Sequence, residues 1–223
     1  MSGNNLIVNN NGRKRRITTP LIALLIAVVI SIAFAGVFVY YPMTVTLQPV
    51  QPPVYFAVGT NSNKDDLGNS VSDTTYTSNT IYESIISSGT SLDITVHPTY
   101  QVTYYKNVAI VYNNDPTKAY KVCFRVETSL NLPAGSEAYL YIYSQGDTRS
   151  LSGYPKPAPS GFLAQIYLTS TDKKCVPTTL GSKQSYEMDL YIYIPGGGNL
   201  ETTYTANLLL IYTPQTSENP PGT

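Results

Sequence analysis

The chain opens with polar and basic residues and then enters an unbroken apolar run. Arg13, Lys14, Arg15 and Arg16 stand directly before this run, which extends from Leu21 to Tyr41. As a helix, about 21 apolar residues measure about 30 Å, which is enough to cross a bilayer. The basic residues favour a cytoplasmic location for residues 1–16. We therefore predict a hydrophobic signal or transmembrane segment over residues 17–41, which exports the rest of the chain.

Three fates of this segment fit the sequence. It stays as an uncleaved membrane anchor, or signal peptidase cuts between Ala35 and Gly36, because Ala33 and Ala35 are small residues at the required spacing. Alternatively, a cut after Arg16 leaves a pilin-type helix.

A different pattern begins within the end of the apolar run. Apolar residues occupy every second position over eleven residues, which is typical of a β-strand and not of a helix. These residues are Val37, Val39, Tyr41, Met43, Val45 and Leu47. We call residues 36–50 the arm. Because the arm precedes prolines at 49, 52 and 53, it need not pair with its own domain; the alternative is that it forms the first strand of its own sheet.

Residues 47–213 read as one extracellular β-domain, followed by a polar, disordered tail over 214–223. Alternation and turn residues predict nine strands: 54–58, 93–97, 102–105, 108–112, 120–127, 138–143, 162–168, 186–194 and 204–212. We expect hairpin-type loops at Asn113–Pro116, Leu132–Gly135 and Pro195–Gly198, and a short helix near Ile81–Ile86. The fold class is therefore all-β, an antiparallel sandwich of jelly-roll or immunoglobulin-like type.

Alternation also assigns faces to the strands. Val122, Phe124 and Val126 point to one side of their strand, with Cys123 on the other. Rows of tyrosines, such as Tyr139, Tyr141 and Tyr143 or Tyr191 and Tyr193, oppose apolar rows. We expect these tyrosine rows to be solvated sheet faces, or alternatively contacts between neighbouring molecules.

The composition argues against enzymatic chemistry. Charged residues make up 13% of the chain, about half the usual fraction, and no basic patch follows the leader, so nucleic acid is not an expected partner. His97 is the only histidine, which leaves too few imidazoles for the usual copper or zinc sites. We expect no enzyme activity, no catalytic residues, no metal and no cofactor.

The chain has two cysteines, Cys123 and Cys175. In an exported protein, such a pair is expected to form a disulfide. Two buried thiols are the alternative.

The order of leader, small-residue cleavage site, alternating arm, proline segment 47–54 and tyrosine-rich sandwich resembles archaeal surface filaments built by donor-strand exchange, namely the TasA-like bundling pili and the archaeal threads. The resemblance implies that the arm inserts into the next subunit, which gives a head-to-tail homopolymer at the cell surface that contacts the membrane only through the leader before processing. Separately, residues 16–23 resemble the start of an archaeal type IV pilin. The alternatives are therefore a type IV pilin and a membrane-anchored extracellular binding or accessory domain.

Overall fold

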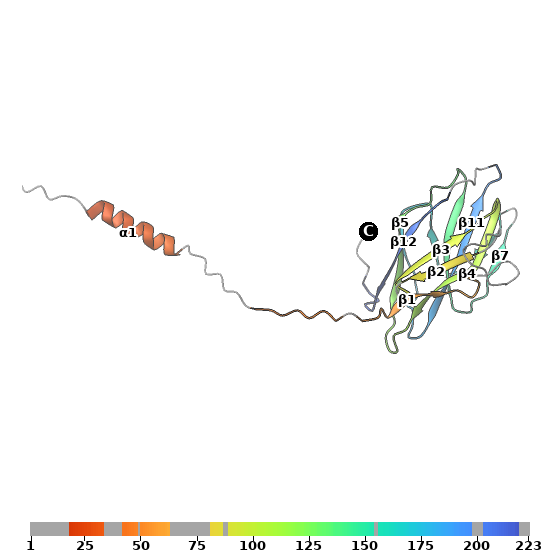
Figure 1. Ribbon diagram of the computed structural model, residues 1–223, viewed down its shortest axis with the longest axis horizontal. Helices are drawn as coiled ribbons and strands as arrows, with labels where there is room; N and C mark the ends of the chain where they lie inside the picture. Colours follow the sequence, from red (N-terminus) through yellow and green to blue (C-terminus); the bar gives the residue numbers. More distant parts are fainter. Residues whose placement is uncertain are drawn as a thin grey trace, which may run out of the picture. The chain divides into compact units, whose positions relative to one another are not determined.

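The computed structural model of the chain describes residues 18–33, 42–48, 50–62, 81–86, 89–153, 156–197 and 203–218 (Figure 1). The chain divides into two compact units, Met1–Pro49 and Val50–Thr223. All of the described strands belong to the second unit.

In the first unit, helix α1 spans Thr18–Ala33, 16 residues of the predicted apolar segment. At 1.5 Å per residue, α1 is about 24 Å long, shorter than the hydrocarbon core of a bilayer. No helix in the described ranges is long and apolar enough to cross a membrane. The transmembrane helix expected over 17–41 is therefore not supported. Ile17 and residues 34–41, with the expected cleavage site at Ala35 and Gly36, lie outside the described residues.

Antiparallel strands form the second unit, which confirms an all-β fold. The largest sheet has five strands in the order β1-β4-β11-β6-β9. Their bounds are Val54–Val58 for β1, Gln101–Asn113 for β4, Ser185–Ile194 for β11, Glu137–Ser144 for β6 and Ala164–Tyr167 for β9.

Three smaller sheets accompany it. A three-stranded sheet has the order β10-β5-β12, with β10 at Lys173–Cys175, β5 at Lys121–Thr128 and β12 at Asn207–Thr213. The strands β2 (Ile81–Ile86) and β3 (Ser91–Val96) pair with each other as a hairpin, and so do β7 (Ser150–Ser152) and β8 (Ala158–Ser160). One core joins the five-stranded sheet to β5, β12 and β3. These strands therefore form the second layer of a sandwich.

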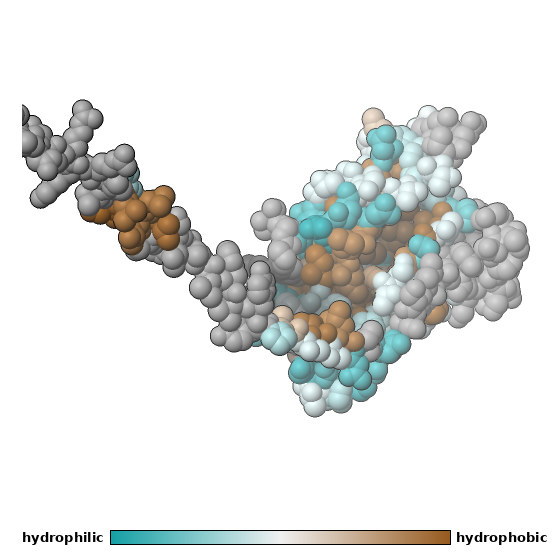
Figure 2. Space-filling view, turned by 60° about the vertical axis from the view of Figure 1, so that its left-hand side comes forward, coloured by the Kyte–Doolittle hydropathy of each residue, from teal (hydrophilic) through white to brown (hydrophobic). Residues whose placement is uncertain are grey.

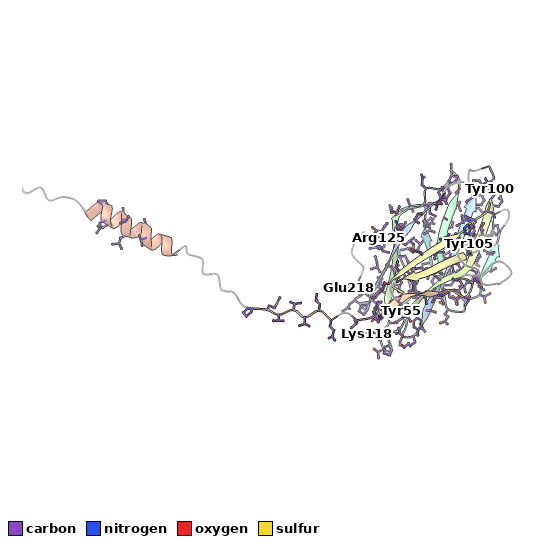
Figure 3. The ribbon with its side chains drawn as sticks, in the orientation of Figure 1. Tyr55, Tyr100, Tyr105, Lys118, Arg125 and Glu218 are labelled. Atoms are coloured by element: carbon purple, nitrogen blue, oxygen red, sulfur yellow. A yellow bond between two sulfur atoms is a disulfide. The ribbon has the colours of Figure 1, made fainter. Side chains whose placement is uncertain are left out.

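The strands of the domain run between two opposite ends, which we name after Lys118 and Tyr100. At the Lys118 end, β4 and β6 end while β1, β5 and β11 begin, because Asn113 pairs with Val54 and Tyr112 pairs with Ser185. At the Tyr100 end, β4 begins opposite the last residue of β11, Ile194. Figure 3 shows Lys118 and Tyr100 at opposite ends of the domain.

All nine predicted strands are found, two of them merged into one, but β7, β8 and β10 were not predicted and a helix was expected where β2 lies. The strands expected at 102–105 and 108–112 are a single strand, β4. The helix expected near Ile81–Ile86 is wrong, because these six residues form β2, paired over their whole length with β3. A helix of six residues is unstable unless tertiary packing stabilises it. As a strand, the same residues form backbone hydrogen bonds with the neighbouring β3.

The three expected hairpin loops are also wrong. Each one connects a strand of the five-stranded sheet to a strand of the three-stranded sheet, so none of the joined strands pair. At the first of them, buried Asn113 donates from Nδ2 to three carbonyl oxygens, those of Lys118, Leu180 and Gly181, at 2.8, 3.1 and 2.8 Å. This side chain holds the chain as it crosses between the layers.

A disulfide joins Cys123 of β5 to Cys175 of β10, the pair expected from the sequence. The two residues stand opposite each other in the strand register. Val122, Phe124 and Val126 are buried in the core on the other face of β5, as alternation predicted. The disulfide thus ties the edge strand β10 to the centre of its sheet.

Replacing both cysteines by alanine should lower the free energy of unfolding by about 3–4 kcal/mol, because the cysteines lie 52 positions apart and the unfolded chain regains the entropy of that loop. Urea unfolding of the oxidised wild type and of the C123A/C175A variant measures the difference. Reduced wild-type protein is the control and should resemble the variant; equal midpoints for all three samples would contradict the prediction.

A half-buried aspartate orders the crossing loop between β4 and β5. Asp115 accepts hydrogen bonds from the backbone N–H groups of Thr117 and Lys118 and from the Tyr120 hydroxyl. These backbone donors lower the pKa of Asp115 from 3.8 to about 2. The folded state therefore favours the ionised carboxylate.

Asp115→Ala should destabilise the protein at pH 7, and the difference from wild type should disappear in strong acid. A lowered pKa gives stability that is fully present above pH 3.8 and is lost as the pH falls through about 2. Unfolding free energies of both proteins at pH 7, 4 and 2 test this. A difference that stays constant down to pH 2 would show that the loop does not depend on the charge of Asp115.

Candidate functional site

The second layer of the sandwich is divided into two parts. The β2–β3 hairpin lies over one side of the five-stranded sheet, since β2 contacts β1 and β4, and the three-stranded sheet reaches the opposite side, where β10 contacts β9. The inner strands of these two parts are therefore β3 and β12. Figure 1 shows β3 between β12 and β2.

Both inner strands have an edge that no described strand occupies. β12 pairs with β5 alone, and β3 pairs with β2 alone. Such an edge presents a row of backbone N–H and C=O groups that can pair with another strand.

Apolar side chains on both inner strands point toward the core but are only partly covered. On β3, Leu92, Ile94 and Val96 alternate with exposed residues. On β12, Leu208, Leu210 and Tyr212 pack against the same core and are also only half-buried. The corresponding residues of β5 are at most 2% exposed, so within the three-stranded sheet the strand with the open edge is less well covered than its neighbour.

The floor between these strands consists of buried apolar residues. Leu140 of β6 and Leu190 of β11 are paired neighbours with 7% and 8% exposure, and Ile142 has none. Figure 2 shows an apolar hollow in one face of the domain, bordered by hydrophilic residues. We call the region bounded by the free edges of β3 and β12, with this floor, the slot.

The arm is the segment that the sequence predicts as the occupant of such a slot. Residues 42–48 have no helical or strand structure, and all seven are exposed. Met43, Val45 and Leu47 are 83%, 65% and 86% exposed, although alternation marks them as one face of a strand. The other predicted arm residues, Val37, Val39 and Tyr41, lie outside the described residues.

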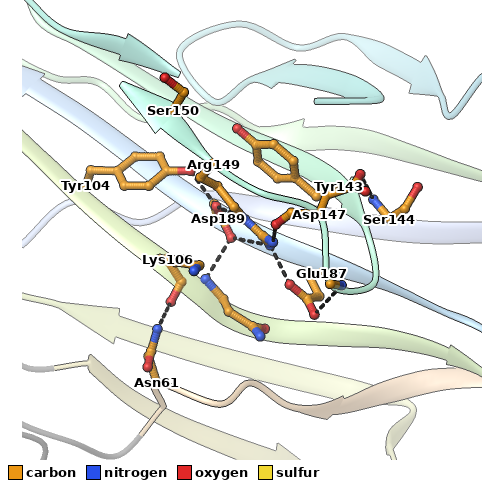
Figure 4. A network of polar contacts seen from close by, with 12 residues as sticks. Asn61, Tyr104, Lys106, Tyr143, Ser144, Asp147, Arg149, Ser150, Glu187 and Asp189 are labelled. Atoms are coloured by element: carbon orange, nitrogen blue, oxygen red, sulfur yellow. Dashed lines mark hydrogen bonds and ion pairs between the residues drawn. The ribbon is translucent and has the colours of Figure 1, made fainter. Parts of the chain in front are cut away.

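A second candidate site lies on the outer face of the five-stranded sheet and was not predicted. Here Arg149 forms ion pairs with Asp189 (Nε to Oδ2, 3.0 Å) and Glu187 (Nη2 to Oε2, 2.6 Å). Its side chain is 5% exposed and that of Asp189 is fully buried. Figure 4 shows how Arg149 reaches both carboxylates from the segment that follows β6.

Further donors complete this network. Asp189 also accepts hydrogen bonds from the Tyr104 hydroxyl and, at 2.7 Å, from the backbone N–H of Asn107. Asn107 has a φ of 48° and lies where the register of β4 and β11 shifts opposite Asp189, as in a β-bulge that redirects a backbone group. Both carboxylates are therefore occupied by donors from this chain.

Burial and pairing have opposite effects on the guanidinium. Burial alone would lower the pKa of Arg149, but hydrogen bonds and charge from Asp189, and then from Glu187, raise it above its ordinary value. Burial, followed by the hydrogen bond to Asp189, raises the pKa of the Tyr104 hydroxyl. The network thus keeps Arg149 charged and Tyr104 protonated, which suits a structural clamp.

The tyrosine rows beside this network were expected to be solvated sheet faces, and this expectation is wrong for most of them. Tyr141, Tyr143 and Tyr191 are at most 4% exposed and form a second apolar cluster, against which the half-buried Tyr139 and Tyr193 pack. The segment between β6 and β9 covers them: Arg149 lies 4.3 Å from the ring centroid of Tyr143, and the Phe162 ring lies 4.8 Å from that of Tyr141. This face of the sheet is therefore covered, whereas the slot on the other side of the described sandwich stays partly open.

Within the described part of the chain, no group of three or more His, Cys, Asp or Glu side chains is arranged to hold a metal ion. In comparisons with known proteins, no family and no curated protein matches the chain. Function is therefore argued from the slot and the arm.

Replacing Arg149 by methionine should lower the free energy of unfolding by about 3–5 kcal/mol, because two buried carboxylates lose their cation. Chemical denaturation measures the loss. Lys156→Met is the matched control: Lys156 also pairs with a glutamate, Glu137, and lies over a tyrosine ring, Tyr193, but it is one-third exposed, so its removal should cost less than about 1 kcal/mol. Equal losses would show that the buried network carries no special weight.

Proposed function

We propose that this protein is a structural subunit of an extracellular filament, in which the arm of one copy fills the slot of another. The observation that carries the proposal is the pair of open strand edges, β3 and β12, flanked by half-buried apolar side chains. A strand added between them would supply hydrogen-bond partners to both edges and cover the side chains at once.

The arm has the chemistry that the slot requires. Met43, Val45 and Leu47 form one apolar face, while Thr44 and Thr46 form the other. With Val37, Val39 and Tyr41, six side chains can be buried, each worth about 1.5–3 kcal/mol. The gross gain is about 9–18 kcal/mol, from which the cost of ordering and associating the chains is subtracted.

We propose that the basic and apolar leader exports the chain and is removed after Ala35, so that the mature protein begins with the arm. The small residues Ala33 and Ala35 support this cleavage site. The disulfide between Cys123 and Cys175 supports an oxidising location outside the cytoplasm. In this proposal, the occupant of the slot is a second copy of the same chain, and no cofactor or nucleic acid takes part.

Replacing Met43, Val45 and Leu47 together by serine, in a protein that begins at Gly36, should abolish filaments. At about 1.5 kcal/mol or more for each side chain, the loss weakens association at least about a thousandfold. Negative-stain microscopy and light scattering measure assembly.

The matched control replaces Thr44 and Thr46 by serine, which changes the same arm on its polar face and should leave assembly intact. If wild-type protein beginning at Gly36 stays monomeric at high concentration, or if the triple variant assembles as well as wild type, the proposed function is wrong.

A further inference from the structure

The two walls of the slot run in opposite directions. Thr213, the last residue of β12, pairs with Lys121 at the Lys118 end. Asn207, its first residue, pairs with Thr128, and two residues later the N–H of Leu130 bonds to Leu168 O at the Tyr100 end. β12 therefore runs from the Tyr100 end to the Lys118 end.

β3 runs the other way. It ends at Val96, and only residues 97–100 separate it from the start of β4 at the Tyr100 end. Before it, Gly89 lies so close to β1 that an added Cβ would come within 2.7 Å of Phe56 O. A single strand in the slot can therefore be antiparallel to β12 or to β3, but not to both.

The arm joins its own domain at a known end. β1 begins at Val54, paired with Asn113 at the Lys118 end, and the Asn114 N–H donates to Pro53 O at 2.7 Å. Residues 49–53, which include the last two residues of the arm and lead into β1, reach at most about 17 Å. The arm of a donor subunit therefore leaves its acceptor close to the donor's own Lys118 end.

The direction of the arm then decides what kind of assembly forms. If it runs antiparallel to β12, it leaves the acceptor at the Tyr100 end, and the Tyr100 end of one subunit meets the Lys118 end of the next. Such a heterologous contact repeats without closing. If the arm runs parallel to β12, both contacts of every subunit involve the Lys118 end, and two subunits can close by exchanging arms reciprocally.

We infer that the arm enters the slot antiparallel to β12 and parallel to β3, so that subunits stack with one constant polarity; this inference rests on the proposed function. Antiparallel pairing has the better hydrogen-bond geometry. β12 is also the longer wall, with seven residues against six in β3. The stronger pairing mode is thus placed on the longer edge.

Cysteine pairs at outward-facing positions test the direction. Thr46→Cys in the arm is combined with Asn207→Cys at the start of β12, or with Thr213→Cys at its end, in protein beginning at Gly36. These two β12 positions lie about 20 Å apart, whereas a disulfide requires Cβ atoms within about 4.5 Å. A register shift of two residues therefore cannot confuse the two results. The native cysteines are already bonded to each other.

The Thr46→Cys/Asn207→Cys protein should form a ladder of covalent oligomers on non-reducing gels, and the Thr46→Cys/Thr213→Cys protein should not. Single-cysteine variants and the pairs with Thr44→Cys in place of Thr46→Cys are the controls. Cross-linking through Thr213→Cys, with dimers in light scattering, would overturn the direction while leaving arm exchange in place. No cross-link in either protein, with only monomers in solution, would overturn both the direction and the proposed function.

Discussion

The structure depends on the need to cover one face of a five-stranded sheet. The opposing layer offers the β2–β3 hairpin on one side and the β10-β5-β12 sheet on the other, and no strand in the described part of the chain pairs with the remaining edges of β3 and β12. On these two strands, half-buried apolar side chains lie beside the unpaired edges, namely Leu92, Ile94 and Val96 on β3 and Leu208, Leu210 and Tyr212 on β12.

The two faces of the five-stranded sheet differ in how they are covered. The outer face carries Asp189, Glu187 and a cluster of tyrosines, and the segment between β6 and β9 seals it through Arg149 and Phe162. A buried ion pair is weak evidence for net stability, but it fixes geometry because its loss leaves charges unpaired. On the opposite face of β11 and β6, Leu190 and Leu140 are paired neighbours in the floor of the slot.

Alternation predicted much of this fold because apolar rows on the strands face one shared core. Val54–Val58 matches β1 residue for residue, and the apolar rows of β5 and β11 point to the core as expected. Turn residues could not tell which strands pair: Asn113–Pro116 reverses the chain, but whether the chain stays in one sheet or crosses to the other depends on contacts with residues far away in sequence.

Arg149 was missed because its partners lie 38 and 40 residues away. The one local signal was that Glu187 and Asp189 occupy the same face of their strand as Tyr191, so that two charged residues continue a row of aromatic residues.

The predicted site was a segment, whereas the slot that we propose as its receptor was not predicted. The arm pattern was visible in Met43, Val45 and Leu47, but the slot is made from β3 and β12, more than a hundred residues apart, and no local pattern joins them.

The short segment between the arm and β1 links the arm to the geometry of the slot. If the arm runs antiparallel to β12, filling its own slot would place Leu47 at the Tyr100 end and Val54 at the Lys118 end. Those points are separated by about 20 Å along the strands and about 10 Å between the layers. The seven residue steps from Leu47 to Val54 reach about 24 Å when fully extended, which leaves no residues to reverse the chain, and Pro49, Pro52 and Pro53 stiffen the path further. The orientation that lets subunits stack in one direction is therefore also the one that keeps each arm out of its own slot and available to a neighbour.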